Sequence, residues 1–221
     1  MSVAAVLVAA GSGERLGLGM PKALVGLAGR SLLDWSLAAF TEHLAVDEVV
    51  VVAPAAAAES LSTVLGPGPV TVVPGGHTRS ESVRRGLAAL SDSTEFVLVH
   101  DAARPLVPTE MISNVVDALL AGAEAVIPVV PVVDTVKRVA DGRVVETVDR
   151  GELCRVQTPQ GFRLAELRQA YAAAPELVAT DDAGVVEAHG GKVVTVAGDE
   201  TAFKITTPYD LRLAELLVAS R

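Results

Sequence analysis

The opening of the chain, residues 3–22, constrains the fold more than any other stretch. Eight consecutive apolar residues, Val3–Ala10, have the length of a strand that is buried on both faces. The run ends in Gly11-Ser12-Gly13, and Arg15 and Lys22 follow within a few residues. A buried parallel strand that ends in a glycine loop exposes backbone N–H groups where open α/β sheets bind ligands. With two cations beside it, the loop predicts a polyphosphate site; a tight strand-to-helix connection is the alternative.

Two common nucleotide-binding fingerprints do not fit this loop. The dinucleotide fingerprint requires glycine at position 16, which is Leu16 in this chain. A Walker loop requires Gly-Lys followed by Ser or Thr, whereas Lys22 lies between Pro21 and Ala23. The loop therefore predicts neither a nicotinamide site nor a P-loop.

The pattern along the rest of the chain predicts an α/β fold. Apolar runs of strand length alternate with helical patterns, and no Gly/Ser-rich linker divides them. A capping box at Ser31–Asp34 begins one helix, and Val-rich runs at 48–53 and 70–73 flank another. This β-α-β-α-β order predicts a Rossmann-like, mostly parallel, doubly wound sheet. We expect a single domain that covers residues 1–221.

Charge and composition narrow the classes of partner. The formal net charge of −9 argues against nucleic-acid binding, so an anionic ligand requires locally placed Arg and Lys. No apolar run approaches the roughly 20 residues of a membrane span, and no basic flank precedes the first run. We therefore expect no membrane association and a cytoplasmic location. Cys154 is the only cysteine, which excludes an internal disulfide.

A second glycine-containing loop follows the third predicted strand. Gly75 and Gly76 allow a ligand to approach the backbone, and a helix is expected to begin just after them. Arg79 and Ser82 would lie on its first turn, within reach of a ligand over the glycines. A helix N-terminus with solvated charges explains the same residues equally well, and His77 alone indicates little.

Asp101 ends another buried strand, predicted from the apolar residues before it, and Arg104 follows in the next loop. A strand-end carboxylate suits Mg²⁺ beside phosphates, because Mg²⁺ takes few, hard oxygen ligands. Such an Asp can instead cap the next helix. Here a separate start signal lies downstream at Pro108-Thr109, which favours the functional interpretation of Asp101.

Residues 134–150 interrupt the α/β pattern. Apolar and polar residues alternate around Asp141-Gly142, a strong signal for a β-hairpin. We expect a β-arm at about residues 132–155. Its exposed valines suit contact with a partner, whereas an edge hairpin packed on its own domain is the alternative.

Lys204 lies in an apolar stretch near the C-terminus, between Phe203 and Ile205. We expect a short strand there, followed by a capping box at Thr207–Asp210 that begins the last helix. A half-buried ammonium group requires an anionic partner. Asp181 and Asp182, earlier in the chain, need be no more than helix caps.

Seven motifs in order resemble the 2-C-methyl-D-erythritol 4-phosphate cytidylyltransferase family. They read AAGSGERLG…PK, GGHTRSESV, HDAARP, DTVK, TVDR…QTPQGF, TDDA and FKITTPYDL, and they extend from Val3 to about Leu217. The resemblance implies transfer of a cytidylyl group from CTP to 2-C-methyl-D-erythritol 4-phosphate in non-mevalonate isoprenoid biosynthesis. Pyrophosphate and 4-diphosphocytidyl-2-C-methyl-D-erythritol are the products. Bifunctional relatives carry a second, cyclodiphosphate synthase domain that is not seen here, so we expect the cytidylyl transfer alone.

The resemblance also implies roles for the matching residues. Arg15, Lys22 and Lys204 would be catalytic, and Asp101 would lie near Mg²⁺. CTP would be bound by Ala9, Ala10, Gly11, Gly13, Arg15, Lys22, Gly76, His77, Ser82 and Ala102. The polyol phosphate would be bound by Asp101, Arg104, Thr135, Arg150, Thr180 and Lys204. The family is a homodimer whose arm reaches the neighbour, so Thr135 and Arg150 would complete the partner's site.

The chain departs from the family pattern at two positions, and two other functions stay open. Some relatives carry an acidic residue at His77 and often Asn at Ala202. A cytidylyltransferase for another polyol phosphate, such as ribitol 5-phosphate, shares the glycine loop and the HD-x-x-RP motif. The other alternative is a nucleotide-binding module without catalysis. Arg15, Lys22, Asp101 and Lys204 are all retained, which argues against such a module, because binding alone would tolerate the loss of some of them.

Overall fold

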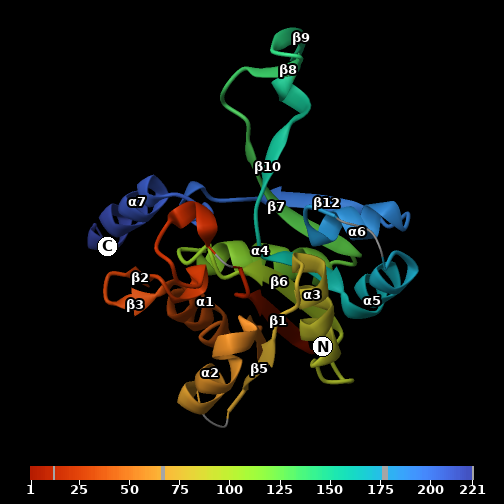
Figure 1. Cartoon of the computed structure of the whole chain (residues 1–221). Helices are drawn as coiled ribbons and strands as arrows, with labels where there is room; N and C mark the ends of the chain where they lie inside the picture. The colour runs from red at the N-terminus through yellow and green to blue at the C-terminus, as the bar shows by residue number, and fades with distance from the viewer. Residues whose placement is uncertain (12, 66–67, 176–178, 221) are drawn as a thin grey trace.

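A computed structural model describes residues 1–11, 13–65, 68–175 and 179–220, and its core is one eight-stranded sheet (Figure 1). The strand order is β10-β7-β11-β6-β1-β4-β5, and β12 pairs with β7. These strands are β1 (Val3–Val8), β4 (Glu48–Ala53), β5 (Val70–Pro74), β6 (Phe96–Asp101), β7 (Ala125–Pro131), β10 (Cys154–Val156), β11 (Gln160–Arg163) and β12 (Val193–Ala197). The pairs β5-β4, β4-β1 and β1-β6 are parallel, which confirms the predicted Rossmann-like sheet.

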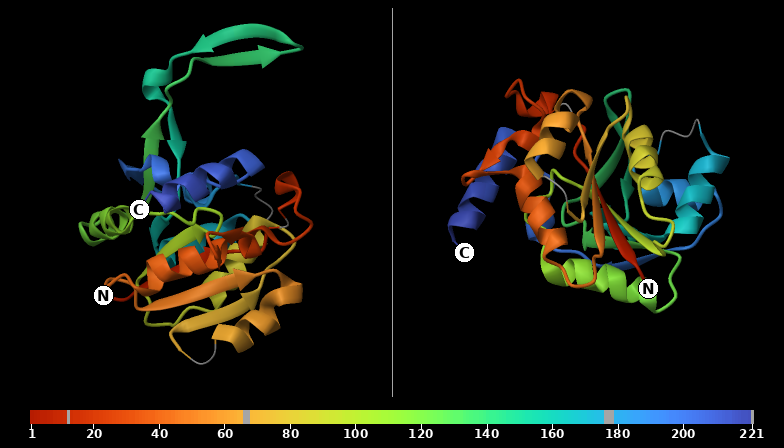
Figure 2. Two further views of the ribbon diagram at one scale, coloured as in Figure 1. Left: turned by 90° about the vertical axis from the view of Figure 1, so that its left-hand side faces the viewer. Right: turned by 90° about the horizontal axis from the view of Figure 1, so that it is seen from below.

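Helices cover both faces of the sheet (Figure 2, right). They are α1 (Leu32–Thr41), α2 (Ala58–Leu65), α3 (Arg79–Ala88), α4 (Thr109–Leu120), α5 (Leu164–Ala173), α6 (Asp182–Ala188) and α7 (Pro208–Ala219). Ala5 and Leu7 of β1 pack in the core cluster formed with α1, α2 and α4, whereas Ala4 and Val6 pack in the cluster formed with α3, α5 and α6. Cover on both faces explains why β1 is apolar without alternation.

Two antiparallel strands, β10 and β11, were not predicted. β11 lies between β6 and β7 and is antiparallel to both. It has only four residues, and Phe162 is its one large apolar side chain. The segment therefore has no apolar periodicity from which a strand could be predicted. A Cβ at Gly161 would lie 2.5 Å from Val115 Cγ1 of α4, which shows how closely that helix approaches. The sheet is therefore mixed beyond β6.

The predicted arm is a projecting hairpin of β8 (Val136–Ala140) and β9 (Arg143–Val148) (Figures 1 and 2). Asp141 and Gly142 have φ of 49° and 73°, as the tight hairpin turn requires. The hairpin extends away from the sheet, so it is not packed on its own core. Its valines are exposed, for example Val144 at 62%.

The remaining elements lie at the edges of this core. β2 (Gly26–Leu27) and β3 (Arg30–Ser31) form a small separate pair. In the part of the chain that the structure describes, short 3-10 helices span Glu14–Leu16, Lys22–Leu24, Ala55–Ala57, Arg150–Glu152 and Glu200–Ala202. No helix in the described ranges has the length and apolar character needed to cross a membrane.

Candidate active site

A cavity of about 510 Å³ opens at the carboxyl ends of β1, β5 and β6. Parallel strands deliver loops to the same edge, and ligands of open α/β sheets bind there. The cavity wall includes nine of the ten predicted CTP residues, namely Ala9, Ala10, Gly11, Gly13, Arg15, Lys22, Gly76, His77 and Ser82. Asp101 and Lys204 also line it. The fold thus brings together the two glycine loops and the strand end at Asp101, which are far apart in the sequence.

The first glycine loop is folded back on Lys22. The N–H of Lys22 donates to the carbonyl oxygen of Gly11 over 3.3 Å. Gly13 has φ of 76°, and a Cβ there would lie 2.9 Å from Lys22 Cβ, so glycine is needed at this position. Ser12, the middle residue of the predicted loop, lies outside the described residues. The loop therefore presents backbone and the Lys22 side chain to the same cavity.

The second glycine loop is held by its own helix. Thr78 caps α3, and the Ser82 hydroxyl accepts from the Gly76 N–H at 3.0 Å and donates to the Thr78 carbonyl at 2.9 Å. The His77 N–H donates to Glu81 at 2.8 Å. Ser82 thus fixes the shape of the loop, and the cavity-facing groups of Gly76 and His77 are held in place.

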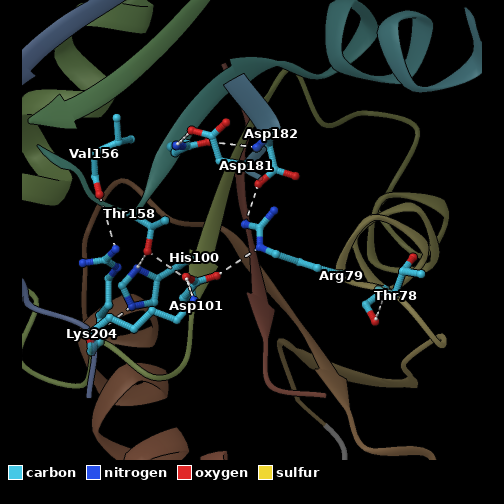
Figure 3. Close-up of polar contacts among 12 residues, drawn as sticks. Thr78, Arg79, His100, Asp101, Val156, Thr158, Asp181, Asp182 and Lys204 are labelled. Atoms are coloured by element: carbon cyan, nitrogen blue, oxygen red, sulfur yellow. Dashed lines mark hydrogen bonds and ion pairs between the residues drawn. The ribbon is translucent and has the colours of Figure 1, made fainter. Parts of the chain in front are cut away.

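Asp101 lines the cavity and lies between two cations, Arg79 and Lys204 (Figure 3). Arg79 Nε lies 3.3 Å from its Oδ1, and Lys204 Nζ lies 2.7 Å from its Oδ2. Burial by itself would raise the pKa of Asp101, but the charges of Arg79 and Lys204 outweigh burial and hold it well below the usual range. Lys204 thus has the anionic partner that its apolar surroundings required.

Lys204 does not lie on a strand, so that part of the prediction was wrong. Residues 203–206 form an extended segment between the 3-10 helix Glu200–Ala202 and α7. Ile205 donates its N–H to the carbonyl oxygen of Ala103, and no strand pairing is recorded for this segment within the described ranges. The capping box that begins α7 is confirmed.

Arg15 and Lys22 differ from Lys204 in having no ion pair with any residue that the structure describes. Arg15 is exposed and Lys22 is half-buried. Burial, together with the charge of Lys204, lowers the pKa of Lys22 to about 8. These two cations give the cavity a positive potential that an anionic ligand would neutralise.

Five predicted site residues lie outside the cavity wall. Ala102 is buried, and its N–H donates to Val8. Arg104 donates Nη1 to the Ala202 carbonyl at 2.9 Å, while Thr180 is exposed just before α6. Thr135 and Arg150 are exposed on the arm and its base, with Arg150 donating to the Val133 carbonyl. Within one chain, none of these five residues lines the cavity with Lys22 and Lys204, although the charge of Arg104 acts on Asp101 and helps to lower its pKa.

Two residues at this site make contacts that the sequence did not predict. Arg79 was expected on the first turn of α3 and contacts both Asp101 and Asp182. Asp181 is the cap of α6, as expected, but Asp182 is fully buried and also accepts from Tyr171 Oη at 2.6 Å. Asp182 lies 103 positions from Arg79, so no local pattern could reveal this contact.

The side chains of the cavity provide only some of the ligands that a divalent metal needs. No cluster of three or more His, Cys, Asp or Glu side chains among the described residues could hold a metal. Asp101 places hard carboxylate oxygens on the cavity wall, where they already pair with Arg79 and Lys204. Mg²⁺ commonly takes one or two carboxylates together with substrate phosphates. The residues present therefore fit a metal that is shared with a bound polyphosphate, and they do not form a site on their own.

Comparisons with known proteins agree with this geometry. The family model described as 2-C-methyl-D-erythritol 4-phosphate cytidylyltransferase matches residues 3–220. Proteins of that name from Frankia casuarinae and Rhodococcus jostii are each 52% identical, over 98% of this chain and 81% and 95% of theirs. The crystal structure of the Thermus thermophilus protein of that name is 40% identical, with a TM-score of 0.82 over 99% of this chain and 100% of its own. The chain belongs to the 2-C-methyl-D-erythritol 4-phosphate cytidylyltransferase family.

Proposed function

We propose that this protein transfers a cytidylyl group from CTP to 2-C-methyl-D-erythritol 4-phosphate and releases pyrophosphate. The observation that carries the proposal is the cavity itself. It joins a glycine loop and two cations, which have no ion pair with any described residue, to an Asp101–Lys204 pair. This cavity lies at the strand edge where α/β folds bind nucleotides. Family membership supports the choice of both substrates.

The nucleotide would span the two glycine loops. Its triphosphate would lie on the backbone of Ala9, Ala10, Gly11 and Gly13, with Arg15 and Lys22 neutralising its charge. The cytosine would face the fixed loop of Gly76 and His77, which Ser82 shapes. A Cβ at Gly75 would lie 2.4 Å from Ala10 Cβ, so the two loops are in close contact. That closeness suits one ligand that touches both.

The acceptor phosphate would enter beside Lys204. One of its oxygens attacks the α-phosphorus of CTP, forming a P–O bond while the bond from the α-phosphorus to the bridging oxygen breaks. Pyrophosphate leaves with that electron pair. A phosphate dianion is already a nucleophile, so the step requires no general base and no covalent enzyme intermediate. Arg15, Lys22 and Lys204 would bring two anions together and stabilise the charge in the transition state.

We infer that Mg²⁺ is the metal and that Asp101 would hold it together with phosphate oxygens of CTP. When bound, the ion would supply neutralising positive charge to the triphosphate. The chain's own residues bind and orient the two substrates.

We further propose that the protein works as a homodimer with exchanged arms. Thr135 and Arg150 lie on or beside a hairpin that projects from the core. The valines of that hairpin are exposed, and an exposed strand pair of this kind suits contact with a second copy. Exchange would bring Thr135 and Arg150 to the partner's acceptor site, where a guanidinium binds phosphate bidentately.

A pyrophosphate-release assay tests the function. The purified protein is given CTP, Mg²⁺ and a panel of polyol phosphates that includes 2-C-methyl-D-erythritol 4-phosphate and ribitol 5-phosphate. We expect release with the methylerythritol phosphate and at least about tenfold lower kcat/KM with the others. Preference for ribitol 5-phosphate would establish the other cytidylyltransferase. CTP binding without release on any acceptor would establish a binding module.

A further inference from the structure

Four charged side chains form a row from the core to the cavity (Figure 3). Asp182 contacts Arg79 at 2.7 Å, Arg79 contacts Asp101 at 3.3 Å, and Asp101 contacts Lys204 at 2.7 Å. Side-chain exposure is 0% at Asp182, 12% at Asp101 and 39% at Lys204. The buried carboxylate of Asp182 is thus linked through Arg79 and Asp101 to Lys204, the end of the row in the cavity.

Asp182 is tied to this row and has no capping task. Asp181 Oδ1 accepts from the N–H of Gly184 and caps α6, which leaves the Asp182 carboxylate for other contacts. Its Oδ2 pairs with Arg79, and its Oδ1 accepts from Tyr171 Oη at 2.6 Å. Burial alone would lower the pKa of Arg79, but the charges of Asp182 and Asp101 raise it. Arg79 therefore stays charged between its two carboxylates.

The two carboxylates share Arg79 unequally. The contact with Asp182 is short, and the contact with Asp101 is at the long end of hydrogen-bond distances. Without the charge of Asp182, the guanidinium would be attracted by Asp101 alone. A guanidinium can occupy both oxygens of one carboxylate, and it would then compete with Lys204 for Asp101.

We propose that Asp182 is a positioning residue that holds Arg79 back from Asp101 and so leaves Asp101 to fix the Lys204 ammonium in the cavity. The contact row stands on the structure alone. Its consequence for turnover rests on the proposed function, in which Lys204 meets the acceptor phosphate.

The test is Asp182→Asn, which removes the charge with little change of shape. Lys204 is labelled with limiting acetic anhydride, and the peptide that carries it is quantified by mass spectrometry against exposed Lys192 in the same sample. An amine released from its carboxylate reacts faster, so we expect at least threefold faster labelling of Lys204. We expect kcat to fall by about 10- to 100-fold, as for other supporting contacts, with the KM for CTP within about twofold.

Tyr171→Phe is the matched control. It removes a hydrogen bond from the same buried carboxylate but leaves the pair with Arg79 in place. We expect a lower Tm, with Lys204 labelling and kcat within about twofold of wild type. If Tyr171→Phe changed Lys204 labelling and kcat as much as Asp182→Asn does, a general loss of order in the site would explain both results, and the proposal would be wrong.

The double variant Arg79→Gln/Asp182→Asn removes the competitor as well as the buried charge. Lys204 should then be labelled no faster than in wild type, and faster labelling would overturn the proposal. Should Asp182→Asn fail to fold, Arg79→Gln alone tests the same point with the same expectation. Labelling of Lys204 does not require turnover. If the wild-type protein transferred no cytidylyl group, the proposed function would be wrong, but the role of Asp182 could still be tested by labelling. If folded Asp182→Asn showed unchanged labelling of Lys204, the positioning role of Asp182 would be wrong and the proposed function would be unaffected.

Discussion

The two sides of the cavity differ in how their charges are balanced before a ligand arrives. On the open side, which we define as Arg15, Lys22 and the first glycine loop, the two cations have no ion pair with any described residue. On the paired side, which we define as Arg79, Asp101 and Lys204, every charge already has a partner.

This difference assigns different tasks to the two sides. Unpaired cations gain most from an incoming polyanion, because no internal ion pair has to be broken first. Paired charges gain less, but they are held in defined positions, which is what orientation of a reacting group requires. The open side thus suits the triphosphate, and the paired side suits the acceptor phosphate at Lys204.

Replacing CTP with UTP tests the fixed loop that adjoins the paired side. Gly76 and His77 are held by Ser82 and Glu81, so their backbone groups cannot easily turn to a different base edge. Loss of buried hydrogen bonds can reject an analogue by several orders of magnitude. We expect kcat/KM for UTP to be at least about 10³-fold below that for CTP with the same acceptor. Comparable values would contradict a base-reading role for this loop.

Lys22→Ala tests the open side. Removing a charge-stabilising donor typically costs about 10²–10³ in rate, and we expect a loss of that size in kcat/KM. The Tm should stay the same or rise, because Lys22 is half-buried beside other cations and has no ion pair among the described residues. Lys204→Ala is the matched variant: a similar loss of rate should come with a lower Tm, since Asp101 loses a partner. Equal Tm changes in the two variants would erase the distinction between the two sides.

Local signals account for most of the fold that could be predicted. The apolar run of β1, the capping box at Ser31 and the Asp141-Gly142 turn are each encoded within a few residues, and the structure has all three. β11 could not be predicted, because one apolar residue between polar neighbours has no period. The expected strand at Lys204 does not form among the described residues. Ile205 donates its N–H to the Ala103 carbonyl, but the N–H of Thr206 donates to the Asp210 side chain, so the segment makes no strand ladder there.

The parts of the site that are built from local sequence motifs could be predicted. Contacts between residues that are far apart in the sequence could not. Both glycine loops and Asp101 reach one cavity because parallel strands end at one edge. The contact of Arg79 with Asp182 joins α3 to α6 across 103 positions, and only the folded chain brings them together. The positions of Thr135 and Arg150 relative to a second chain stay a prediction.

The pH dependence of turnover tests the role of the Lys22 charge on the open side. Lys22 has a pKa of about 8, so it is protonated below this pH and loses its charge above it. We expect kcat/KM for CTP to be level below pH 8 and to fall about tenfold per unit above it. Lys22→Arg keeps its charge throughout this range and should abolish that fall. A wild-type profile that stays level to pH 9.5 would show that the open side does not depend on this charge.

The exchanged arm is tested by the partial activity that two inactive variants recover when they are mixed. Arg150→Ala and Lys204→Ala homodimers should each be nearly inactive, because every site lacks one phosphate ligand. If Arg150 serves the partner's site, a mixed dimer places both defects in one site and leaves the other intact. An equal mixture after subunit exchange should then recover about one quarter of wild-type activity. If Arg150 serves its own site, both sites of the mixed dimer are defective. Proven mixed dimers without activity would therefore contradict exchange.

A crystal structure with bound CTP tests the central claim, that the open side binds the triphosphate while the paired side stays in place. We predict phosphate oxygens within hydrogen-bond distance of the backbone of Gly11 and Gly13 and of Lys22 Nζ, and the base against Gly76 and His77. The short contact between Arg79 and Asp182 should be unchanged. A triphosphate bound away from Lys22, or one that takes Arg79 from Asp182, would contradict the account.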